Sequence, residues 1–285
     1  TEFLEADRAE DDFWSWREKM YRAALSLDAE QFEAIARFAF MEMARAGYTT
    51  VGEFHYVHHD GDGDPYPDPN ELAKRTVRAA RDAGLRIALL RTAYHRAGYD
   101  EEPNPRQRRF LEPDLETYLQ RFEALASHVD EIDGATAGLA PHSIRAVPGE
   151  WLEGIAEVAE HQQLPVHIHA CEQPAEIDQS REEYGMPPIE VFADRELLSD
   201  RTVVVHATHA SDREIELLAE HGSAVCACPT TERNLGDGFL PARRLVDRDV
   251  PICLGTDSHA DIDPWAEMRL VEYHERLRAR QRNVL

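Results

Sequence analysis

Lysine is almost missing from this sequence. Only Lys19 and Lys74 are present in a chain of 285 residues, so nearly all of the positive charge is carried by arginine. Together the 31 basic residues face 55 acidic ones, and the formal net charge is −24. A chain with this balance has no basic coat with which to bind nucleic acid or an anionic lipid surface. We therefore expect neither a nucleic-acid partner nor a membrane partner.

Long apolar runs and cysteines are also scarce. No uncharged apolar run approaches the roughly 20 residues that a membrane-spanning helix requires. The four cysteines, at positions 171, 226, 228 and 253, lie in short apolar stretches and form no disulfide-like framework. No signal peptide is recognisable, so we predict a cytoplasmic location under reducing conditions. The 42% share of hydrophobic residues is too high for a disordered acidic chain.

Short apolar runs alternate with longer amphipathic stretches along the chain. The runs are rich in Val, Ile, Ala or Thr, which is typical of strands buried on both faces of a parallel sheet. Strands are predicted at 48–56, 86–94, 135–143, 165–171, 202–209, 223–231 and 251–258. Helices are predicted at 12–24, 28–46, 69–83, 114–129, 149–161, 212–221 and 264–280.

This regular alternation indicates βα units with right-handed crossovers. The seven predicted strands leave two possibilities. One is an open doubly wound sheet, and the other is a (β/α)8 TIM-like barrel whose first strand lies upstream of Thr1. Because the length is close to the roughly 250 residues of such barrels, we interpret residues 1–285 as a single domain.

Histidines and carboxylates gather where the predicted strands end, which is where such barrels carry their catalytic residues. One strand runs into His169 and Glu172, the next into His206, and the last into Asp257. Imidazole and carboxylate groups are zinc ligands, and a catalytic zinc keeps one position for water. Glu172, just beyond its strand, could hold that water and move its protons. The alternative is a polar hydrogen-bonded layer without catalytic function.

Several motifs resemble the amidohydrolase superfamily. The strings His-Ile-His169-Ala-Cys-Glu172, Val-His206-Ala-Thr-His and Gly-Thr-Asp257-Ser-His are similar to its fifth, sixth and eighth strands. More narrowly, Phe13-Trp-Ser-Trp-Arg17, Glu53-Phe-His-Tyr56 and Pro229-Thr-Thr-Glu232-Arg-Asn-Leu-Gly-Asp-Gly resemble the formimidoylglutamate deiminases. The resemblance implies a metal-dependent hydrolase with a TIM-like barrel. Its reaction would convert N-formimidoyl-L-glutamate and water into N-formyl-L-glutamate and ammonia, a step of histidine breakdown.

The resemblance also implies roles for individual residues. His169 would be a zinc ligand, and Asp257 would be a second ligand that also accepts a proton from the attacking water. Glu172 would carry protons to the leaving nitrogen, and His206 would polarise or protonate the reacting imine. These four residues form the catalytic and metal-binding set that the resemblance implies.

Four further positions match residues that grip the glutamate part of the substrate: Arg17, Tyr56, His142 and Arg145. A physical reason supports them, because the substrate carries two carboxylates while the whole chain carries a charge of −24. Affinity must then come from local cations, and arginine binds carboxylates through two parallel hydrogen bonds. We therefore expect a small-molecule dicarboxylate substrate.

The sequence departs from the family at its first strand. In the family that strand supplies two metal ligands through a His-x-His pair, whereas residues 1–12 contain no histidine. The family's small β-sandwich, built from both termini, also has no counterpart. We therefore expect a fragment truncated at both ends, in which two or three ligands would hold zinc weakly.

Two other functions stay open. A deaminase of the same superfamily could act on a different amidine or guanidino substrate, although a pair of arginines favours a dicarboxylate. An inactive barrel could serve as a binding or oligomerisation module, although Glu172, His206 and Asp257 count against it. A homodimer is expected from the resemblance alone.

Overall fold

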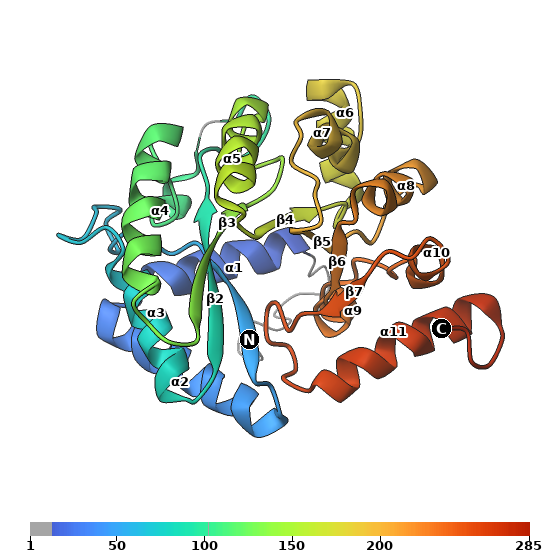
Figure 1. Ribbon diagram of the computed structural model, residues 1–285, viewed down its shortest axis with the longest axis horizontal. Helices are drawn as coiled ribbons and strands as arrows, with labels where there is room; N and C mark the ends of the chain where they lie inside the picture. Colours follow the sequence, from blue (N-terminus) through green and yellow to red (C-terminus); the bar gives the residue numbers. More distant parts are fainter. Residues whose placement is uncertain (1–12, 102) are drawn as a thin grey trace. The chain divides into compact units, whose positions relative to one another are not determined.

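The computed structural model describes residues 13–101 and 103–285. Seven strands are arranged in chain order from β1 to β7, and every pair of strands whose register is defined is parallel (Figure 1). The predicted α/β architecture with seven parallel strands is therefore confirmed. The chain divides into two compact units. The assignment of residues 1–285 to one domain stays a prediction.

We call the first of these the N-terminal unit, which comprises Arg17–His142 and Ala146–His167. Its elements are most of α1 (Phe13–Leu25), α2 (Ala29–Ala46), β1 (Thr50–His55), α3 (Glu71–Asp82), β2 (Arg86–Ala93), the 3-10 helix η2 (Pro105–Gln107), α4 (Leu115–Val129), β3 (Ala135–Pro141), α5 (Gly149–Gln162) and the start of β4 (Val166–Ala170). Helix α2 begins with a capping box between Asp28 and Gln31 and ends at Gly47, whose φ of 102° favours glycine. Helices α3 and α4 pack against β2, and α4 and α5 pack against β3.

We call the other the C-terminal unit, which comprises Ile168–Leu285 together with Ser143–Arg145 and residues 13–16. After the end of β4 it contains α6 (Pro174–Tyr184), α7 (Pro188–Asp194), β5 (Thr202–His206), α8 (Asp212–His221), β6 (Ala224–Ala227), α9 (Pro229–Leu235), α10 (Ala242–Val246), β7 (Ile252–Leu254) and α11 (Pro264–Ala279). The strands β5, β6 and β7 pair in parallel. Helix α8 starts with a second capping box, between Ser211 and Glu214.

All seven predicted strands extend beyond the observed strand ends, three of them by three or four residues. The strand predicted to reach residue 209 stops at His206, where φ turns to 73°, and Ala207 follows with a φ of 54°. The strand predicted to reach residue 231 stops at Ala227, because Pro229 begins α9. Proline suits the first helical position, where no N–H donor is needed. The last strand stops at Leu254 rather than at residue 258.

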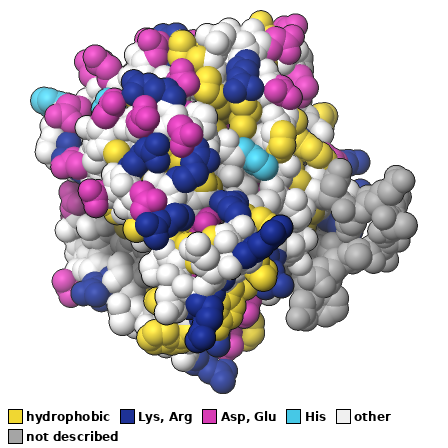
Figure 2. Space-filling view, turned by 90° about the vertical axis from the view of Figure 1, so that its right-hand side faces the viewer, with side chains coloured by type: hydrophobic (Ala, Val, Ile, Leu, Met, Phe, Trp, Pro, Cys, Tyr) yellow, Lys and Arg dark blue, Asp and Glu magenta, His cyan; other side chains and the backbone are white. Residues whose placement is uncertain are grey.

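Exposed arginines of the C-terminal unit are paired with carboxylates. Figure 2 shows basic and acidic side chains interspersed over one face of the molecule. Arg244 and Arg248 lie 2.8 and 3.4 Å from Asp212, and Arg243 lies 2.8 Å from Asp247. Such exposed pairs contribute about 0–1 kcal/mol each. Ion pairing therefore accounts for these arginines without a ligand.

The longest helix within the described residues is α2, which has 18 residues. Over residues 13–101 and 103–285, no helix combines the length and the apolar character needed to cross a membrane.

Candidate active site

The candidate site of the C-terminal unit is built where its strands end. Strand β4 runs into Cys171 and Glu172, β5 ends at His206, and the segment after β7 reaches Asp257. At Cys171, His206 and Asp257 the backbone φ values are 54°, 73° and 41°. A non-glycine residue held in this region costs about 1–3 kcal/mol, and such strain is concentrated at functional sites. The turns at these three residues therefore mark this edge as a candidate site.

His206 lies at the centre of the site and is only 1% exposed. Its Nε2 atom lies 3.4 Å from Glu172 Oε1 and 3.8 Å from Asp257 Oδ2. Its Nδ1 atom lies 3.4 Å from Glu232 Oε1. The ring of His169 stacks on that of His206 with 5.5 Å between centroids. The four residues that the sequence singled out as catalytic or metal-binding thus lie together in this unit, while their roles stay predictions.

The carboxylates around His206 control its charge. Burial by itself would lower the pKa of His206, but Glu172, Glu232 and Asp257 outweigh this effect and raise it to about 10. Loss of solvation and the neighbouring Glu172 and Glu232 raise the pKa of Asp257, although its side chain keeps 27% of its surface exposed. An imidazolium beside several carboxylates is a proton donor placed next to proton acceptors.

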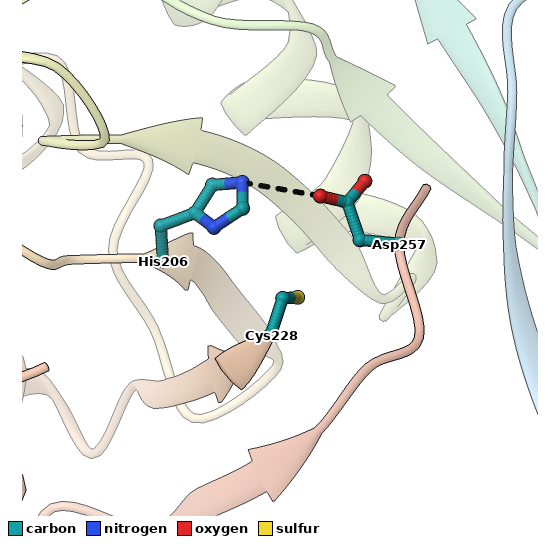
Figure 3. Close-up of side chains that lie close together, drawn as sticks. All are labelled: His206, Cys228 and Asp257. Carbon is teal, nitrogen blue, oxygen red and sulfur yellow. Dashed lines mark ion pairs between the residues drawn. The ribbon is translucent and has the colours of Figure 1, made fainter. Parts of the chain in front are cut away.

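One group of possible metal ligands converges within the described residues. The ligand atoms of His206, Cys228 and Asp257 all lie within 4.8 Å of one another. Figure 3 shows His206 and Asp257 facing each other with Cys228 beside them. Imidazole, thiolate and carboxylate are donors that zinc accepts. The predicted ligand His169 adjoins this group through its stacked ring, whereas Cys228 was not predicted.

Arg145, predicted to bind a substrate carboxylate, also belongs to the C-terminal unit. Its Nη2 atom lies 3.5 Å from Glu172 Oε2, and its Nε atom lies 4.0 Å from Glu176 Oε1. Its guanidinium carbon lies 5.6 Å from the ring centre of Phe13 and 6.0 Å from that of Trp14. Arg145 therefore touches the predicted catalytic carboxylate directly, in a setting that is 6% exposed.

The other predicted substrate residues belong to the N-terminal unit. The rings of Tyr56 and His142 meet edge to face with centroids 5.7 Å apart. Arg17 lies over the ring of Tyr21 at 5.7 Å and lines a cavity of about 500 Å³ together with Gln107 of η2. The substrate-binding roles of these residues stay predictions.

Two buried glutamates of the site were given no role from the sequence. Glu176 Oε2 accepts the backbone N–H of Glu172 at 3.1 Å, and Glu232 Oε1 accepts that of Cys228 at 2.9 Å. Each follows a proline at the start of a helix and reaches back four residues to a strand end. This arrangement resembles a capping box, although each glutamate here reaches back four residues and not three. A glutamate soon after a helix-starting proline was the signal that the sequence offered.

Comparisons with known proteins agree with these motifs. The model of the amidohydrolase family matches residues 3–282. Formimidoylglutamate deiminase of Pseudomonas aeruginosa is 41% identical over 281 residues, which cover 98% of this chain and 61% of that protein. A 5-methylthioadenosine/S-adenosylhomocysteine deaminase of Halobacterium salinarum is 30% identical over 93% of this chain and 56% of that protein. The crystal structure of an amidohydrolase from Brucella melitensis gives a TM-score of 0.94 at 39% identity, over 99% of this chain and 63% of that one. The chain thus spans about three fifths of the length of these relatives.

Proposed function

The chain belongs to the amidohydrolase family, and on that premise we propose that it is the catalytic part of a metal-dependent deiminase. The reaction is hydrolysis of the C=N bond of N-formimidoyl-L-glutamate to N-formyl-L-glutamate and ammonia. The observation that carries the proposal is the convergence of Glu172 and Asp257 on the ring of His206. The similarity to the Pseudomonas aeruginosa enzyme supports the choice of substrate.

A divalent metal ion fits the residues of the site. His169 and Asp257 are the proposed ligands, and Cys228 adds a donor of compatible chemistry. When bound, such an ion lowers the pKa of a coordinated water to roughly 7 and so supplies a nucleophile at neutral pH. Because the donors are imidazole, thiolate and carboxylate, zinc suits this site better than magnesium or calcium, which prefer oxygen ligands.

The residues around His206 manage the protons of the reaction. Glu172 and Asp257 accept protons from the attacking water, whose oxygen forms a new bond to the formimidoyl carbon. The bond from that carbon to the terminal nitrogen then breaks, and ammonia leaves with both protons of the water. The carboxylate neighbours of His206 raise its pKa to about 10, and its ring polarises the imine through a hydrogen bond to the terminal nitrogen.

The substrate's glutamate part requires cations that the protein as a whole does not supply. With a net charge of −24, long-range attraction opposes a dicarboxylate, so local contacts must provide the affinity. Arg145 is buried beside Glu172 and can bind a carboxylate close to the reacting group. Arg17, which lines the cavity of about 500 Å³, is the proposed partner of the other carboxylate. Tyr56 and His142 are the two remaining proposed substrate-binding residues.

A second candidate is deamination of a purine nucleoside. The 30% identity to a 5-methylthioadenosine/S-adenosylhomocysteine deaminase favours it. 5-Methylthioadenosine, however, gives the buried guanidinium of Arg145 no carboxylate to bind, and S-adenosylhomocysteine carries one carboxylate where the glutamate part carries two. The dicarboxylate is therefore the better match to the charges of this chain.

Ammonia release from a panel of substrates tests the proposal. N-formimidoyl-L-glutamate, a guanidino acid and 5-methylthioadenosine are supplied to the zinc-loaded chain. We expect kcat/KM for the first to exceed that for the others by about tenfold or more, since unpaired buried polar groups penalise a wrong substrate. Faster ammonia release from 5-methylthioadenosine would support the second candidate instead. No ammonia release from any substrate would favour a binding module.

A further inference from the structure

The segment Pro229–Gly238 contains a buried glutamate to which the proposed reaction assigns no role. Glu232 is 1% exposed and lies in α9, near the start of the helix. Its Oε1 atom accepts the backbone N–H of Cys228 at 2.9 Å. The same oxygen lies 3.4 Å from His206 Nδ1, while Oε2 has no hydrogen-bond partner within the described part of the chain. Glu232 therefore joins the start of α9 to the imidazole at the centre of the site.

The two nitrogens of His206 face different groups. Nε2 faces Glu172 and Asp257, at 3.4 and 3.8 Å, whereas the ion-pair partner of Nδ1 within residues 13–101 and 103–285 is Glu232. The backbone at His206 has a φ of 73°, and Ala207 N–H donates to Ala170 O at 3.0 Å. The backbone thus fixes where the ring is attached, and a contact at Nδ1 is needed to fix how the ring is turned.

The direction of the contact at Nδ1 follows from the atoms involved. Glu232 Oε1 already accepts a backbone N–H, so it acts as an acceptor, and a proton carried by that carboxyl group would lie on Oε2. The proton between Oε1 and Nδ1 therefore belongs to the imidazole. This holds for a neutral ring and for an imidazolium, because both can carry a proton on Nδ1.

We propose that Glu232 is a positioning residue that accepts the Nδ1–H of His206 and thereby turns Nε2 toward Glu172 and Asp257. A carboxylate behind an imidazole is a common way to fix the orientation of a catalytic histidine. The position of the proton on Nδ1 is argued only from the contacts of the His206 ring. The effect of Glu232 on turnover rests in addition on the proposed function.

The competing explanation is that Glu232 only anchors α9. The chain offers a matched control in Glu267 of α11, which is fully buried and holds the same helix start. Glu267 accepts the backbone N–H of Thr230 at 3.0 Å and the hydroxyl of Thr230 at 2.5 Å. No contact of Glu267 with His206 is recorded for the described residues, so a change there tests anchoring without touching the imidazole.

Nuclear magnetic resonance of the chain, labelled with nitrogen-15 in its histidine rings, tests the placement of the proton. We expect a downfield, slowly exchanging Nδ1–H resonance that His206→Asn removes and thereby assigns. Glu232→Ala abolishes it, Glu232→Gln retains it because the amide oxygen can accept, and Glu267→Gln leaves it in place. Survival of the resonance in Glu232→Ala, or its loss in Glu267→Gln, would overturn the proposal. If Glu232→Ala does not fold, Glu232→Asp, which withdraws the oxygen from Nδ1, provides the same comparison.

Steady-state kinetics of the same variants test the catalytic consequence. Glu232→Ala should lower kcat by about tenfold or more with a nearly constant KM, because a misoriented acid–base group loses part of a contribution of about 10²–10⁴. Glu232→Gln should recover most of that loss, and Glu267→Gln should match the wild type. An unchanged kcat in a variant that has lost the resonance would refute the catalytic part. Because the resonance needs no turnover, failure of the wild type to hydrolyse N-formimidoyl-L-glutamate would count against the proposed function alone.

Discussion

At the scale of single residues, the candidate site is defined by one imidazole among carboxylates. Glu172, Glu232 and Asp257 all lie within 4 Å of the ring nitrogens of His206. Isolated carboxylates lose much of their solvation when buried, and a shared cation offsets part of that cost. Around Glu172, His206 and Arg145 are the cations that offset the lost solvation of the carboxylate. Each single substitution here changes a balance of charge as well as a contact.

Replacement of the proposed proton carrier tests the first part of this account. Glu172→Gln should leave fold and metal content intact and lower kcat by about 10²–10⁴-fold, the usual contribution of an acid–base group. Turnover and metal content are measured on the same preparation. Glu182→Gln, at an exposed position of α6, is the control and should behave like the wild type. Substantial turnover in Glu172→Gln would remove this residue from the mechanism.

Loss of the buried arginine tests the substrate contact. Arg145→Ala should raise KM for N-formimidoyl-L-glutamate by about tenfold or more, because a charge-assisted hydrogen bond contributes roughly 1.5–3 kcal/mol. The measurement is the KM of the variant beside that of Arg181→Ala, an exposed arginine on α6. An unchanged KM in Arg145→Ala would place the substrate carboxylate elsewhere.

The sequence located these residues better than it described their contacts. Strand ends rich in histidine and carboxylate pointed to His169, Glu172, His206 and Asp257, because parallel strands bring their ends to one edge. The contact of Arg145 with Glu172 was not predictable, since it depends on side-chain conformations that spacing does not determine. Cys228 was overlooked as a donor because a cysteine in a predicted apolar strand is most often a core residue.

At the scale of helices and strands, local signals predicted helix boundaries and strand starts more reliably than strand ends. Helix α2 was predicted at 28–46 and spans Ala29–Ala46, because Asp28 and Gly47 are strong boundary residues. The strand ends were overestimated because apolar residues continue into turns with positive φ, as at His206 and Ala207. Residues of the site lie in those turns, and apolar periodicity does not predict the turns.

Close packing of strands predicts sensitivity at one glycine. A Cβ atom on Gly138 of β3 would lie 2.8 Å from Leu90 Cδ2 and 2.9 Å from the backbone oxygen of Pro165. Gly138→Ala should therefore destabilise the chain by about 1–3 kcal/mol, as overpacking does. In Gly154→Ala the clash is with the flexible tip of Leu115, so the loss should be much smaller. Urea unfolding compares the two variants, and equal stability of both would contradict this packing.

The ion-pair cluster between α2 and α3 predicts a pH dependence of stability. Hydrogen bonds from Arg78, opposed by burial and assisted by Arg75, lower the pKa of Glu33 to about 2. The folded state therefore favours the ionised carboxylate. Its stabilisation is complete above the ordinary pKa of 4.5 and is lost as the pH falls toward about 2.

Glu33→Gln should remove this dependence and cost at most about 3 kcal/mol at neutral pH, because one pKa unit corresponds to about 1.4 kcal/mol. Urea unfolding of the variant and the wild type between neutral and acidic pH measures the difference. The exposed pair of Glu42 and Arg45 provides the control, and Glu42→Gln should change stability by less than about 1 kcal/mol. If the free energy of unfolding of Glu33→Gln and of the wild type fell equally with pH, the ionised carboxylate of Glu33 would not stabilise the fold.

At the scale of the whole molecule, the negative charge of the chain opposes the anionic substrate that we propose. A net charge of −24 disfavours the approach of a dicarboxylate, so we expect recognition to depend on local arginines such as Arg145 and not on long-range steering. Composition predicted this requirement, and the order of strands and helices predicted the α/β fold. The proposed substrate itself was inferred from motif resemblance, because no pattern of charge or periodicity specifies a formimidoyl group.

Hydrolysis in water enriched in oxygen-18 tests the central claim most directly. The zinc-loaded chain is incubated with N-formimidoyl-L-glutamate, and the product is analysed by mass spectrometry. Because the water oxygen becomes bonded to the formimidoyl carbon, we predict N-formyl-L-glutamate that carries one heavy oxygen in its formyl group and equimolar ammonia. Formation of the product without the label, or release of unsubstituted glutamate in its place, would contradict the account.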